Sequence, residues 1–500
     1  MSASSLHFQN VCFAYDKTAQ PLINDLTVRF AHGWTGIGGA NGVGKTTILK
    51  LAAGLLTPQQ GRIIAPESVI YCQQRTDNPP EQLGTLLQTL NSDAFRIRDR
   101  LGVADDWLER WSTLSHGERK RAQIAVALWQ EPELLALDEP TNHLDADALE
   151  MLFHALSGYR GIGLLVCHDR HLLDELCRQC LFVDPPDTIL RPGGYTKGLQ
   201  QAELDQTSAQ RQREQAKLEL AKLKQEAGKR RDAASQADRK RSKRGLAVQD
   251  HDARAKINAA RITGKDAVAG KRLNQLAGRL SQAQQKLDST QVKKSYATGI
   301  WLPGERSKRN TLFDLPTGSL ALGEQRQLDY PDLTMQPADR IALTGLNGSG
   351  KSTLLRLIVG SLNLPPERLS YIPQEIDLAA SREILARARN LPHDTLGQML
   401  TIVSRLGSRP ERLLESDEPS PGEIRKILLA IGIASTPHLI IMDEPTNHLD
   451  LVSIECLERA LTDCPCGLLL VSHDVRFLNA LTTTSWHIAR NDAQHFVLSI

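Results

Sequence analysis

The sequence predicts an α/β protein made of two copies of one domain in tandem, joined by an α-helical hairpin. Motifs that recur at a nearly constant distance along a chain indicate a duplication. The recurring pairs are Lys45 and Lys351, 306 positions apart, and Asp138 with Asp443 and His168 with His473, each 305 positions apart. Between the copies the composition changes, because residues 196–295 contain no Pro, Cys, Phe, Tyr or Trp. We place the domains at residues 1–198 and 301–500 and the hairpin at 199–300.

Length and composition agree with this architecture. The chain has 500 residues, of which 41% are hydrophobic and 24% charged, as in ordinary globular proteins. A formal net charge of +2 over the whole chain is too small to indicate a nucleic-acid partner. No apolar stretch approaches the roughly 18 to 20 residues that a membrane span needs, and the first residues do not form a signal peptide. We therefore expect a cytoplasmic protein without a membrane domain.

Each copy contains the phosphate-binding pattern GxxxxGK[ST] between an apolar strand and an apolar helix, which is the context this pattern requires. The glycines let backbone N–H groups surround a phosphate, and the helix adds its positive end. We expect Lys45 and Lys351 to reach the β- and γ-phosphates of ATP, and the hydroxyls of Thr46 and Ser352 to bind Mg²⁺. The other expected nucleotide-binding residues are Gly39, Asn41, Gly42, Gly44 and Thr47 in the first copy and Gly345, Asn347, Gly348, Gly350 and Thr353 in the second.

An acidic pair ends a short apolar strand in each copy. We expect Asp138 and Asp443 to hold Mg²⁺ or its water. Glu139 and Glu444 follow directly and are expected to polarise the water that attacks the γ-phosphate. A single Asp-Glu-Pro could be a turn, but two at matching positions favour catalysis. His168 and His473, each at the end of an apolar strand, are further catalytic candidates near the γ-phosphate.

The segment between the copies has the apolar spacing of two antiparallel helices. The seam positions, spaced by three and four residues, are Ala216, Leu220, Leu223 and Ala227 in one helix and Leu273, Leu276, Leu280, Ala283 and Leu287 in the other. Residues 211–300 hold 23 Lys and Arg against 9 Asp and Glu, a net charge of +14, which leaves −12 for the rest of the chain. A basic run, Arg239–Arg244, marks the expected tip. The hairpin is therefore the part that suits an RNA partner.

Together these motifs resemble those of the ATP-binding cassette (ABC) proteins, over nearly everything outside residues 199–300. In that family an LSGGE-type signature from one cassette completes the ATP site of the other. The counterparts here, residues 114–118 and 419–423, keep the serine, the second glycine and the glutamate, but replace the middle glycine by His116 and Pro421. The resemblance implies nucleotide contacts from Ser115 and Gly117 in one signature and from Ser420 and Gly422 in the other.

The same resemblance assigns three further residues. Gln74 and Gln374 match the glutamine that contacts Mg²⁺ and nucleotide in the family. Tyr15 stands where such proteins stack an aromatic ring on adenine, whereas the same spacing in the second copy leads to Ala321. Because both cassettes lie in one chain, the resemblance implies that they pair within a monomer.

Three kinds of cassette protein are compatible with these motifs: an F-subfamily translation factor, a fused ATPase subunit of a membrane importer, and a DNA-associated ATPase. The TNHLD sequences at residues 141–145 and 446–450 resemble the F-subfamily form. Importer fusions have a short connector, and DNA-repair relatives are expected to carry zinc-binding cysteine pairs or much longer coiled coils. The F subfamily is therefore favoured.

Membership of that subfamily implies a place in the tRNA exit site of the ribosome. The linker at 211–300 would then contact rRNA and reach toward the P-site tRNA and the peptidyl-transferase centre. The sequence leaves open whether the protein is a housekeeping translation factor or protects ribosomes against antibiotics. It also leaves open which ATP site hydrolyses faster.

Overall fold

The computed structural model describes residues 5–15, 21–142, 144–240, 265–289, 305–323, 326–406, 421–447, 449–492 and 494–500. The chain divides into two compact units. One comprises residues 1–198 and 296–500, and the other comprises residues 199–295. Most of the basic tip that the sequence predicts around residues 239–262 lies outside the described residues.

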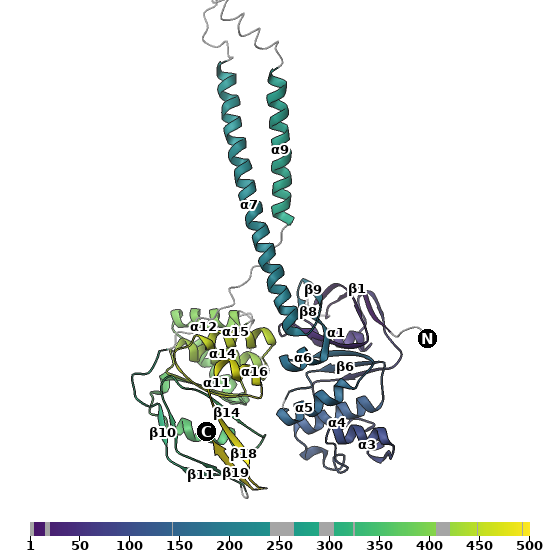
Figure 1. The fold of residues 1–500 in the computed structure, drawn as a ribbon, viewed down its shortest axis with the longest axis vertical. Coiled ribbons are helices and arrows are strands. Elements are labelled where there is room, and N and C mark those ends of the chain that lie inside the picture. The colour runs from purple at the N-terminus through teal and green to yellow at the C-terminus, as the bar shows by residue number, and fades with distance from the viewer. Residues whose placement is uncertain are drawn as a thin grey trace, which may run out of the picture. The chain divides into compact units, whose positions relative to one another are not determined.

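The first copy contains nine strands and six α-helices in its described part (Figure 1). The strands are β1 (Leu6–Phe13), β2 (Ile23–Phe30), β3 (Gly33–Gly38), β4 (Gln60–Ile64), β5 (Val69–Cys72), β6 (Leu134–Asp138), β7 (Ile162–Val166), β8 (Cys177–Asp184) and β9 (Asp187–Pro192). The helices are α1 (Lys45–Ala52), α2 (Leu83–Gln88), α3 (Ser92–Arg100), α4 (His116–Trp129), α5 (Ala146–Ser157) and α6 (Arg170–Leu176).

The second copy repeats this succession of elements. Its described strands are β10 (Phe313–Leu315), β11 (Gly318–Ala321), β12 (Gln327–Tyr330), β13 (Leu333–Met335), β14 (Arg340–Gly345), β15 (Leu369–Ile372), β16 (Leu439–Asp443), β17 (Gly467–Val471), β18 (Thr484–Arg490) and β19 (His495–Ser499). Its helices are α10 (Lys351–Gly360), α11 (Leu378–Arg389), α12 (His393–Arg405), α14 (Pro421–Ala434), α15 (Leu451–Thr462) and α16 (Val475–Leu481).

Strand order shows that the two copies share one topology. The main sheet of the first copy runs β5-β6-β7-β3-β8-β9, and the second has the matching run β15-β16-β17-β14-β18-β19. In the second copy the hairpin β11-β12 extends this sheet, pairing through β19, whereas β1, β2 and β4 of the first copy form a separate antiparallel sheet. The α/β duplication expected from the motif spacing is confirmed.

The central strands are buried on both faces, which is why they read as apolar runs rather than as alternating patterns. Every residue of β6, β7, β16 and β17 is buried. In both copies the acidic strand pairs in parallel with its neighbour, so that Asp138 lies beside Val166 and Asp443 beside Val471. The polar residues that follow these four strands therefore collect at one edge of each sheet.

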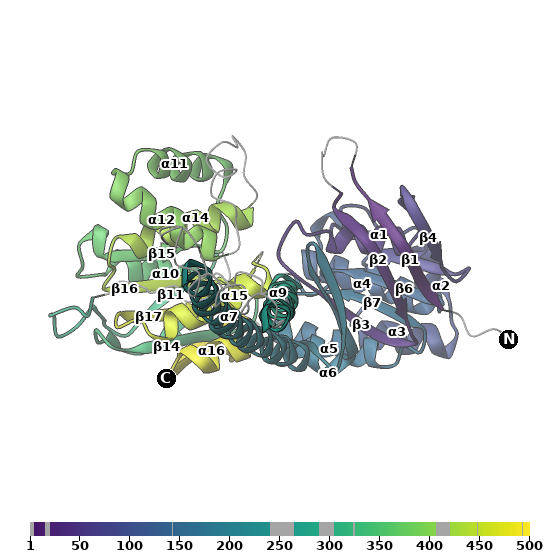
Figure 2. The ribbon, with the colours of Figure 1, turned by 90° about the horizontal axis from the view of Figure 1, so that it is seen from above.

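The smaller unit is a pair of helices. Helix α7 (Tyr195–Lys240) starts in the larger unit and continues through residues 199–240, and α9 (Lys265–Ser289) lies beside it (Figures 1 and 2). The predicted seam is found, because Leu220, Leu223, Ala227, Leu276 and Ala283 are buried together, with Leu280 and Leu287 packed against them. At 1.5 Å per residue, the 46 residues of α7 extend about 69 Å. No helix among the described residues is long and apolar enough to cross a membrane.

A half-buried carboxyl in α15, that of Glu455, makes stability depend on pH. Burial raises the pKa of Glu455 to about 7, although Arg170 and Arg459 act to lower it. Its folded-state pKa therefore exceeds that of an unfolded glutamate, so the protonated form stabilises the fold at low pH and this stability is lost as the pH rises through 7. Glu455→Gln should raise the free energy of unfolding by about 2 kcal/mol at pH 8 and leave it unchanged near pH 4.5.

Thermal melting across pH 4.5 to 8 checks this expectation. The matched control is Glu150→Gln, because Glu150 is the sequence counterpart in the first copy and is exposed. The melting temperatures of the two variants should diverge as the pH rises, with Glu455→Gln the higher. Parallel melting curves at every pH would show that the ionised Glu455 carries no penalty.

Candidate nucleotide sites

The two phosphate-binding loops have the same backbone shape. Gly44 and Gly350 precede α1 and α10 with left-handed φ angles of 105° and 96°. Only glycine adopts this conformation without strain. Gly39 has no room for a side chain either, because a Cβ there would lie 2.4 Å from the carbonyl oxygen of Val183. The sequence-predicted loop residues thus lie together at the N-terminus of one helix in each copy, where backbone N–H groups bind anions well.

The loop lysines lie folded onto their own loops. Lys45 Nζ donates to the carbonyl oxygens of Gly39 (2.8 Å) and Ala40 (3.0 Å), and Lys351 Nζ donates to that of Gly345 (2.7 Å). Burial lowers the pKa of both ammonium groups, while nearby carboxylates act to raise it. An incoming phosphate would replace these carbonyls with a charged acceptor, which is a stronger partner.

In the second copy, three oxygen-bearing side chains that the sequence predicts as metal ligands come together. Ser352 Oγ lies 3.5 Å from Oε1 of Gln374 and makes a hydrogen bond with the carboxylate of Asp443. Oδ1 of Asp443 is buried and has no hydrogen-bond partner among the described residues. Burial raises the pKa of Asp443, and the hydrogen bond from Ser352 lowers it. Hydroxyl, amide and carboxylate oxygens are the donors that Mg²⁺ prefers, so this set fits the ion.

In the first copy, only two of the three expected Mg²⁺ ligands, Thr46 and Asp138, come together. Thr46 makes a hydrogen bond with Asp138, and Tyr71 donates to Oδ2 of the same carboxylate at 3.0 Å. Gln74 points elsewhere, because its Nε2 donates to Glu139 Oε2 at 2.7 Å. The glutamine that the sequence assigns to Mg²⁺ thus contacts the catalytic candidate instead.

Both candidate catalytic glutamates have strained backbones. Glu139 and Glu444 have φ angles of 46° and 51°, which is uncommon for a residue with a side chain. Each backbone N–H donates at 2.8 Å to the neighbouring strand, at Val166 and Val471 respectively. Such strain persists only where the surroundings impose it, and it occurs preferentially at functional sites. The two glutamates therefore share one backbone conformation, each at the end of its own sheet.

The carboxylates of the two glutamates have different partners. Glu139 accepts hydrogen bonds from Gln74 and from Nδ2 of Asn142 (2.6 Å), and its Oε1 lies 3.2 Å from Nε2 of His168. Burial acts to raise the pKa of Glu139, but the hydrogen bond and charge of His168, the hydrogen bond from Asn142 and the charge of Lys45 outweigh it and lower the pKa to about 2. This carboxylate is therefore ionised and held in place.

Glu444 is nearly fully buried, at 3% exposed, and burial raises its pKa despite Lys351 nearby. Its Oε2 accepts from the backbone N–H of His473 at 3.3 Å. Nε2 of His473 lies 3.3 Å from Glu444 Oε1 and 3.2 Å from Asn347 Oδ1, and burial lowers the pKa of this histidine to about 4. The second site thus holds a neutral histidine beside the phosphate-binding loop.

The first signature begins helix α4 as expected. Ser115 caps the helix, because its Oγ accepts from the backbone N–H of Glu118 (3.2 Å) while Glu118 accepts from the N–H of Ser115 (2.8 Å). Gly117 is buried in the first turn. In the second signature, Pro421 starts α14 and Gly422 follows it, whereas Ser420 lies outside the described residues. Proline suits the first position of a helix, so its replacement of glycine keeps the helix start.

One contact joins the copies at the first nucleotide site. The backbone N–H of Asn41 donates to Asp450 Oδ2 at 2.9 Å, and both residues belong to the larger unit. Asp450 ends the second TNHLD sequence and caps α15 through the N–H of Ser453. A residue that follows the second acidic strand therefore contacts the first phosphate-binding loop.

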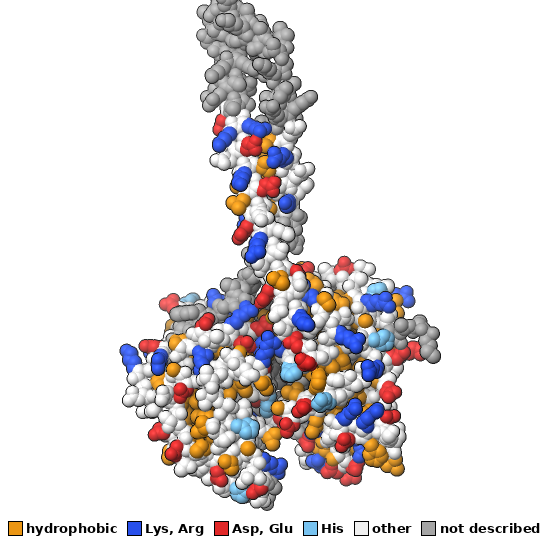
Figure 3. Space-filling view, viewed as in Figure 1, with side chains coloured by type: hydrophobic (Ala, Val, Ile, Leu, Met, Phe, Trp, Pro, Cys, Tyr) orange, Lys and Arg blue, Asp and Glu red, His pale blue; other side chains and the backbone are white. Residues whose placement is uncertain are grey.

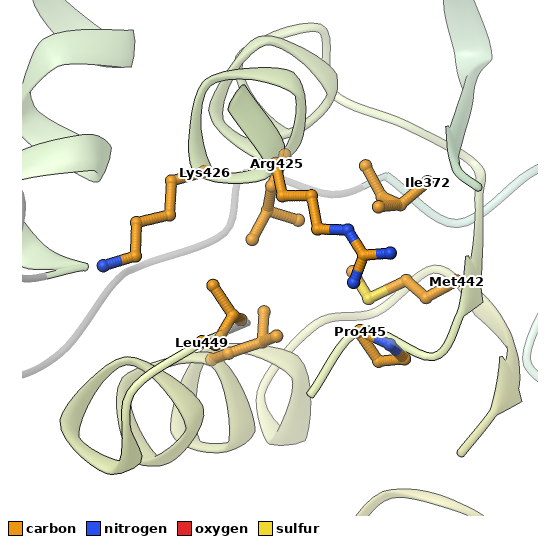
Figure 4. A pocket seen from close by; sticks show the side chains of 8 residues that line it. Ile372, Arg425, Lys426, Met442, Pro445 and Leu449 are labelled. Carbon is orange, nitrogen blue, oxygen red and sulfur yellow. The ribbon is translucent and has the colours of Figure 1, made fainter. Parts of the chain in front are cut away.

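Three buried cations in the described signature helices were not predicted from the sequence: Lys120 in α4, and Arg425 and Lys426 in α14. Arg425 is 5% exposed and donates from Nη1 to the carbonyl oxygens of Glu444 (2.8 Å) and Asn447 (3.0 Å) and from Nη2 to that of Gln374. Figure 4 shows its guanidinium between Ile372, Met442 and Pro445, with Lys426 pointing the other way. Arg425 therefore links the signature helix to the backbone of the Gln374 loop and of the loop that carries Glu444 and Asn447. The adjacent charges of Arg425 and Lys426, directly before an apolar stretch of α14, are the signal that could have identified it.

Its counterpart in the first copy is Lys120, 3% exposed, whose Nζ donates to the carbonyl oxygen of Gln73 at 2.7 Å. Burial lowers the pKa of Lys120 to about 8. The lysine reaches the loop of Gln74 but makes no bond to the Glu139 loop among the described residues.

Tyr15, the predicted adenine-stacking residue, lies beside the start of α1. Its hydroxyl is 3.2 Å from Oγ1 of Thr47, and the ring packs edge-on against Phe13. Tyr15 is 43% exposed, so solvent reaches it. Ala321, at the same spacing in the second copy, is exposed and offers no ring.

Comparisons with known proteins place this geometry in a family. The family model described as "ABC transporter" matches residues 23–142 and 328–447. Similar relatives include the tylosin resistance ATP-binding protein TlrC of Streptomyces fradiae, which is 31% identical over 89% of this chain and 90% of its own length. The ribosome protection protein VmlR of Bacillus subtilis is 28% identical over 91% of this chain and 82% of its own length. ABC transporter F family member 4 of Arabidopsis thaliana is 27% identical over 93% and 71%.

Among solved structures, the chain is similar to one titled as the complex of the archaeal ribosomal stalk protein aP1 and the archaeal ribosome recycling factor aABCE1. The TM-score is 0.62 with 18% sequence identity, over 98% of this chain and 89% of that one. Similarity at this level concerns the fold, and it agrees with two cassette domains in tandem.

Proposed function

Because the chain belongs to the F subfamily of the ATP-binding cassette family of ATPases, we propose that it binds the ribosome when both of its cassettes hold ATP. In this proposal it occupies the exit-site region and uses residues 211–300 to act on the P-site tRNA or the peptidyl-transferase centre. ATP hydrolysis then separates the cassettes and releases the protein. It works in the cytoplasm as a monomer whose cassettes pair within one chain.

The ATP sites carry out hydrolysis with the residues described above. Lys45 and Lys351 bind the β- and γ-phosphates, and Glu139 and Glu444 orient the attacking water and accept its proton. His168 and His473 contact the γ-phosphate from the next strand. Mg²⁺, held through Thr46 and Asp138 or through Ser352, Gln374 and Asp443, supplies charge neutralisation at the phosphates.

The charge and shape of the helical hairpin support an RNA partner. The +14 of residues 211–300 contrasts with −12 for the rest of the chain. Lys and Arg side chains occur along the described part of the hairpin, interspersed with Asp and Glu (Figure 3). No aromatic residue occurs between 196 and 295, so the hairpin suits contacts with phosphates and RNA shape rather than base stacking.

The single observation that carries the proposal is this basic hairpin in a chain whose relatives include a ribosome protection protein and a tylosin resistance protein. Both relatives match over about nine-tenths of this chain. The same relatives support a role in protecting ribosomes against antibiotics, beside a role as a general translation factor.

Neutralising one face of α7 tests the hairpin. Lys217, Lys224 and Arg231 are exposed and seven residues apart, so they lie on one side of the helix. Changing all three to Gln should weaken ribosome binding and lower the slope of log K against log salt by about 2 to 3, since each lost phosphate contact removes about 0.7 to 0.9. Co-sedimentation with ribosomes at several KCl concentrations measures this, while ATP hydrolysis without ribosomes should not change.

The matched control changes three exposed arginines of the cassettes, Arg29, Arg62 and Arg387, to Gln. This variant has the same net charge as the α7 variant. If both triple variants show the same salt slope, the effect is general electrostatics, and the hairpin is a spacer rather than an RNA-binding element.

A further inference from the structure

The second nucleotide site lacks the aromatic ring that Tyr15 provides in the first, and a different side chain lies over its phosphate-binding loop. That side chain is Arg326, at the start of β12. Its backbone carbonyl accepts a hydrogen bond from the N–H of Leu322 at 2.6 Å, which closes the turn of the β11-β12 hairpin. Arg326 is exposed, and its guanidinium has no hydrogen bond or ion pair to the described residues.

Apolar packing fixes this hairpin against the loop. A Cβ built on Gly350 would lie 2.7 Å from Cδ2 of Leu322 and 3.3 Å from Cδ2 of Leu328. Leu328 is fully buried in the core of the second copy. The start of β12 therefore has a defined position beside the loop, and so does the backbone of Arg326.

The guanidinium lies against Gly348. A Cβ built on that glycine would be 3.3 Å from Nη1 of Arg326, whereas a Cβ on its counterpart Gly42 would meet no atom within 4 Å. Gly348 belongs to the GxxxxGK[ST] loop, whose backbone N–H groups surround the phosphates of a bound nucleotide. The cation is thus within contact distance of the loop at the second site, where the first site has open space.

We infer that Arg326 is a nucleotide-binding residue of the second ATP site and that its guanidinium contacts the phosphate chain. Guanidinium groups bind phosphate oxygens through two parallel hydrogen bonds, and this contact is stronger than a neutral hydrogen bond. At the second site, the binding free energy from this phosphate contact then compensates for the missing adenine-stacking ring. This inference rests on the proposed assignment of the second site and is independent of the ribosome.

Nucleotide titration of the full-length chain tests the inference. In a Lys45→Ala background, which disables the first site, ATPγS binding at the second site is measured by calorimetry. Arg326→Ala should raise Kd about five- to tenfold, as expected for the loss of a partly exposed charge-assisted contact. The increase should occur with ADP as well and be absent with adenosine. Arg326→Lys should recover most of the affinity, because it keeps the positive charge.

Three controls separate the possible failures. Lys351→Ala should abolish binding, and if it does not, the assignment of the second site is wrong. Arg387→Ala, which removes an exposed charge on α11, should leave Kd unchanged. If Lys351→Ala abolishes binding but Arg326→Ala has no effect, Arg326 is not part of the site. If Arg326→Tyr restores affinity and Arg326→Lys does not, the residue stacks on the base and the phosphate assignment is overturned.

Discussion

The double variant Glu139→Gln/Glu444→Gln is expected to bind ATP as tightly as the wild type and to hydrolyse it at least about a hundredfold more slowly. Each glutamate lies at the end of its sheet in a strained conformation, with φ angles of 46° and 51°. Glutamine has nearly the same size and preserves the fold, but it cannot accept the proton of the attacking water. Phosphate release under saturating ATP measures the loss, and nucleotide titration measures the retained affinity.

The single variants show what each glutamate contributes. Glu139 is ionised and held by Gln74 and Asn142, whereas Glu444 is buried, with its pKa raised. Glu150→Gln serves as a control, because Glu150 is an exposed residue of α5 that is not among the site residues. Turnover by the double variant close to the wild-type rate would exclude both glutamates as catalytic residues.

Arg425→Ala is expected to destabilise the second cassette by about 3 to 5 kcal/mol and to reduce its ATP turnover more than tenfold. The substitution removes a buried guanidinium and leaves the carbonyl groups of Gln374, Glu444 and Asn447 without this donor. Buried polar groups that lose their partner cost about 1 to 3 kcal/mol each. Thermal melting measures the stability, and single-turnover kinetics in a Glu139→Gln background measures the second site.

Two variants act as controls for Arg425. Arg425→Lys keeps a charge but can reach fewer of these carbonyls, so its loss should be intermediate. Lys120→Ala removes the first-copy counterpart, which bonds to the Gln73 carbonyl but not to the Glu139 loop. It should leave the geometry of Glu139 intact. Equal effects of Arg425→Ala and Lys120→Ala on hydrolysis would contradict a specific role for Arg425.

Much of the fold could be predicted from the sequence because its signals are local. The apolar runs Leu134–Asp138 and Leu439–Asp443 are strands buried on both faces. Leu220, Leu223 and Ala227, spaced by three and four residues, form the α7 side of the hairpin seam. Glycine-rich loops before α1 and α10 follow from backbone chemistry that no other residue satisfies. Duplication adds to these signals, because each appears twice.

The differences between the two sites could not be predicted in this way, because they depend on contacts between residues distant in the sequence. Gln74 and Gln374 occupy matching positions, yet the first donates to Glu139 and the second lies beside Ser352. Arg425 and Arg326 act through neighbours that only folding brings close. A motif assigns a residue type to a place in a site, whereas its hydrogen-bond partners are set by tertiary packing.

We propose that the ATP-bound form of this protein binds the ribosome and that the ADP-bound form does not. The most direct test is co-sedimentation of the Glu139→Gln/Glu444→Gln variant with ribosomes in the presence of ATP or ADP. The variant is expected to pellet with ribosomes in the presence of ATP and to remain in the supernatant in the presence of ADP. If the variant binds ATP and yet stays free of ribosomes, the claim is contradicted.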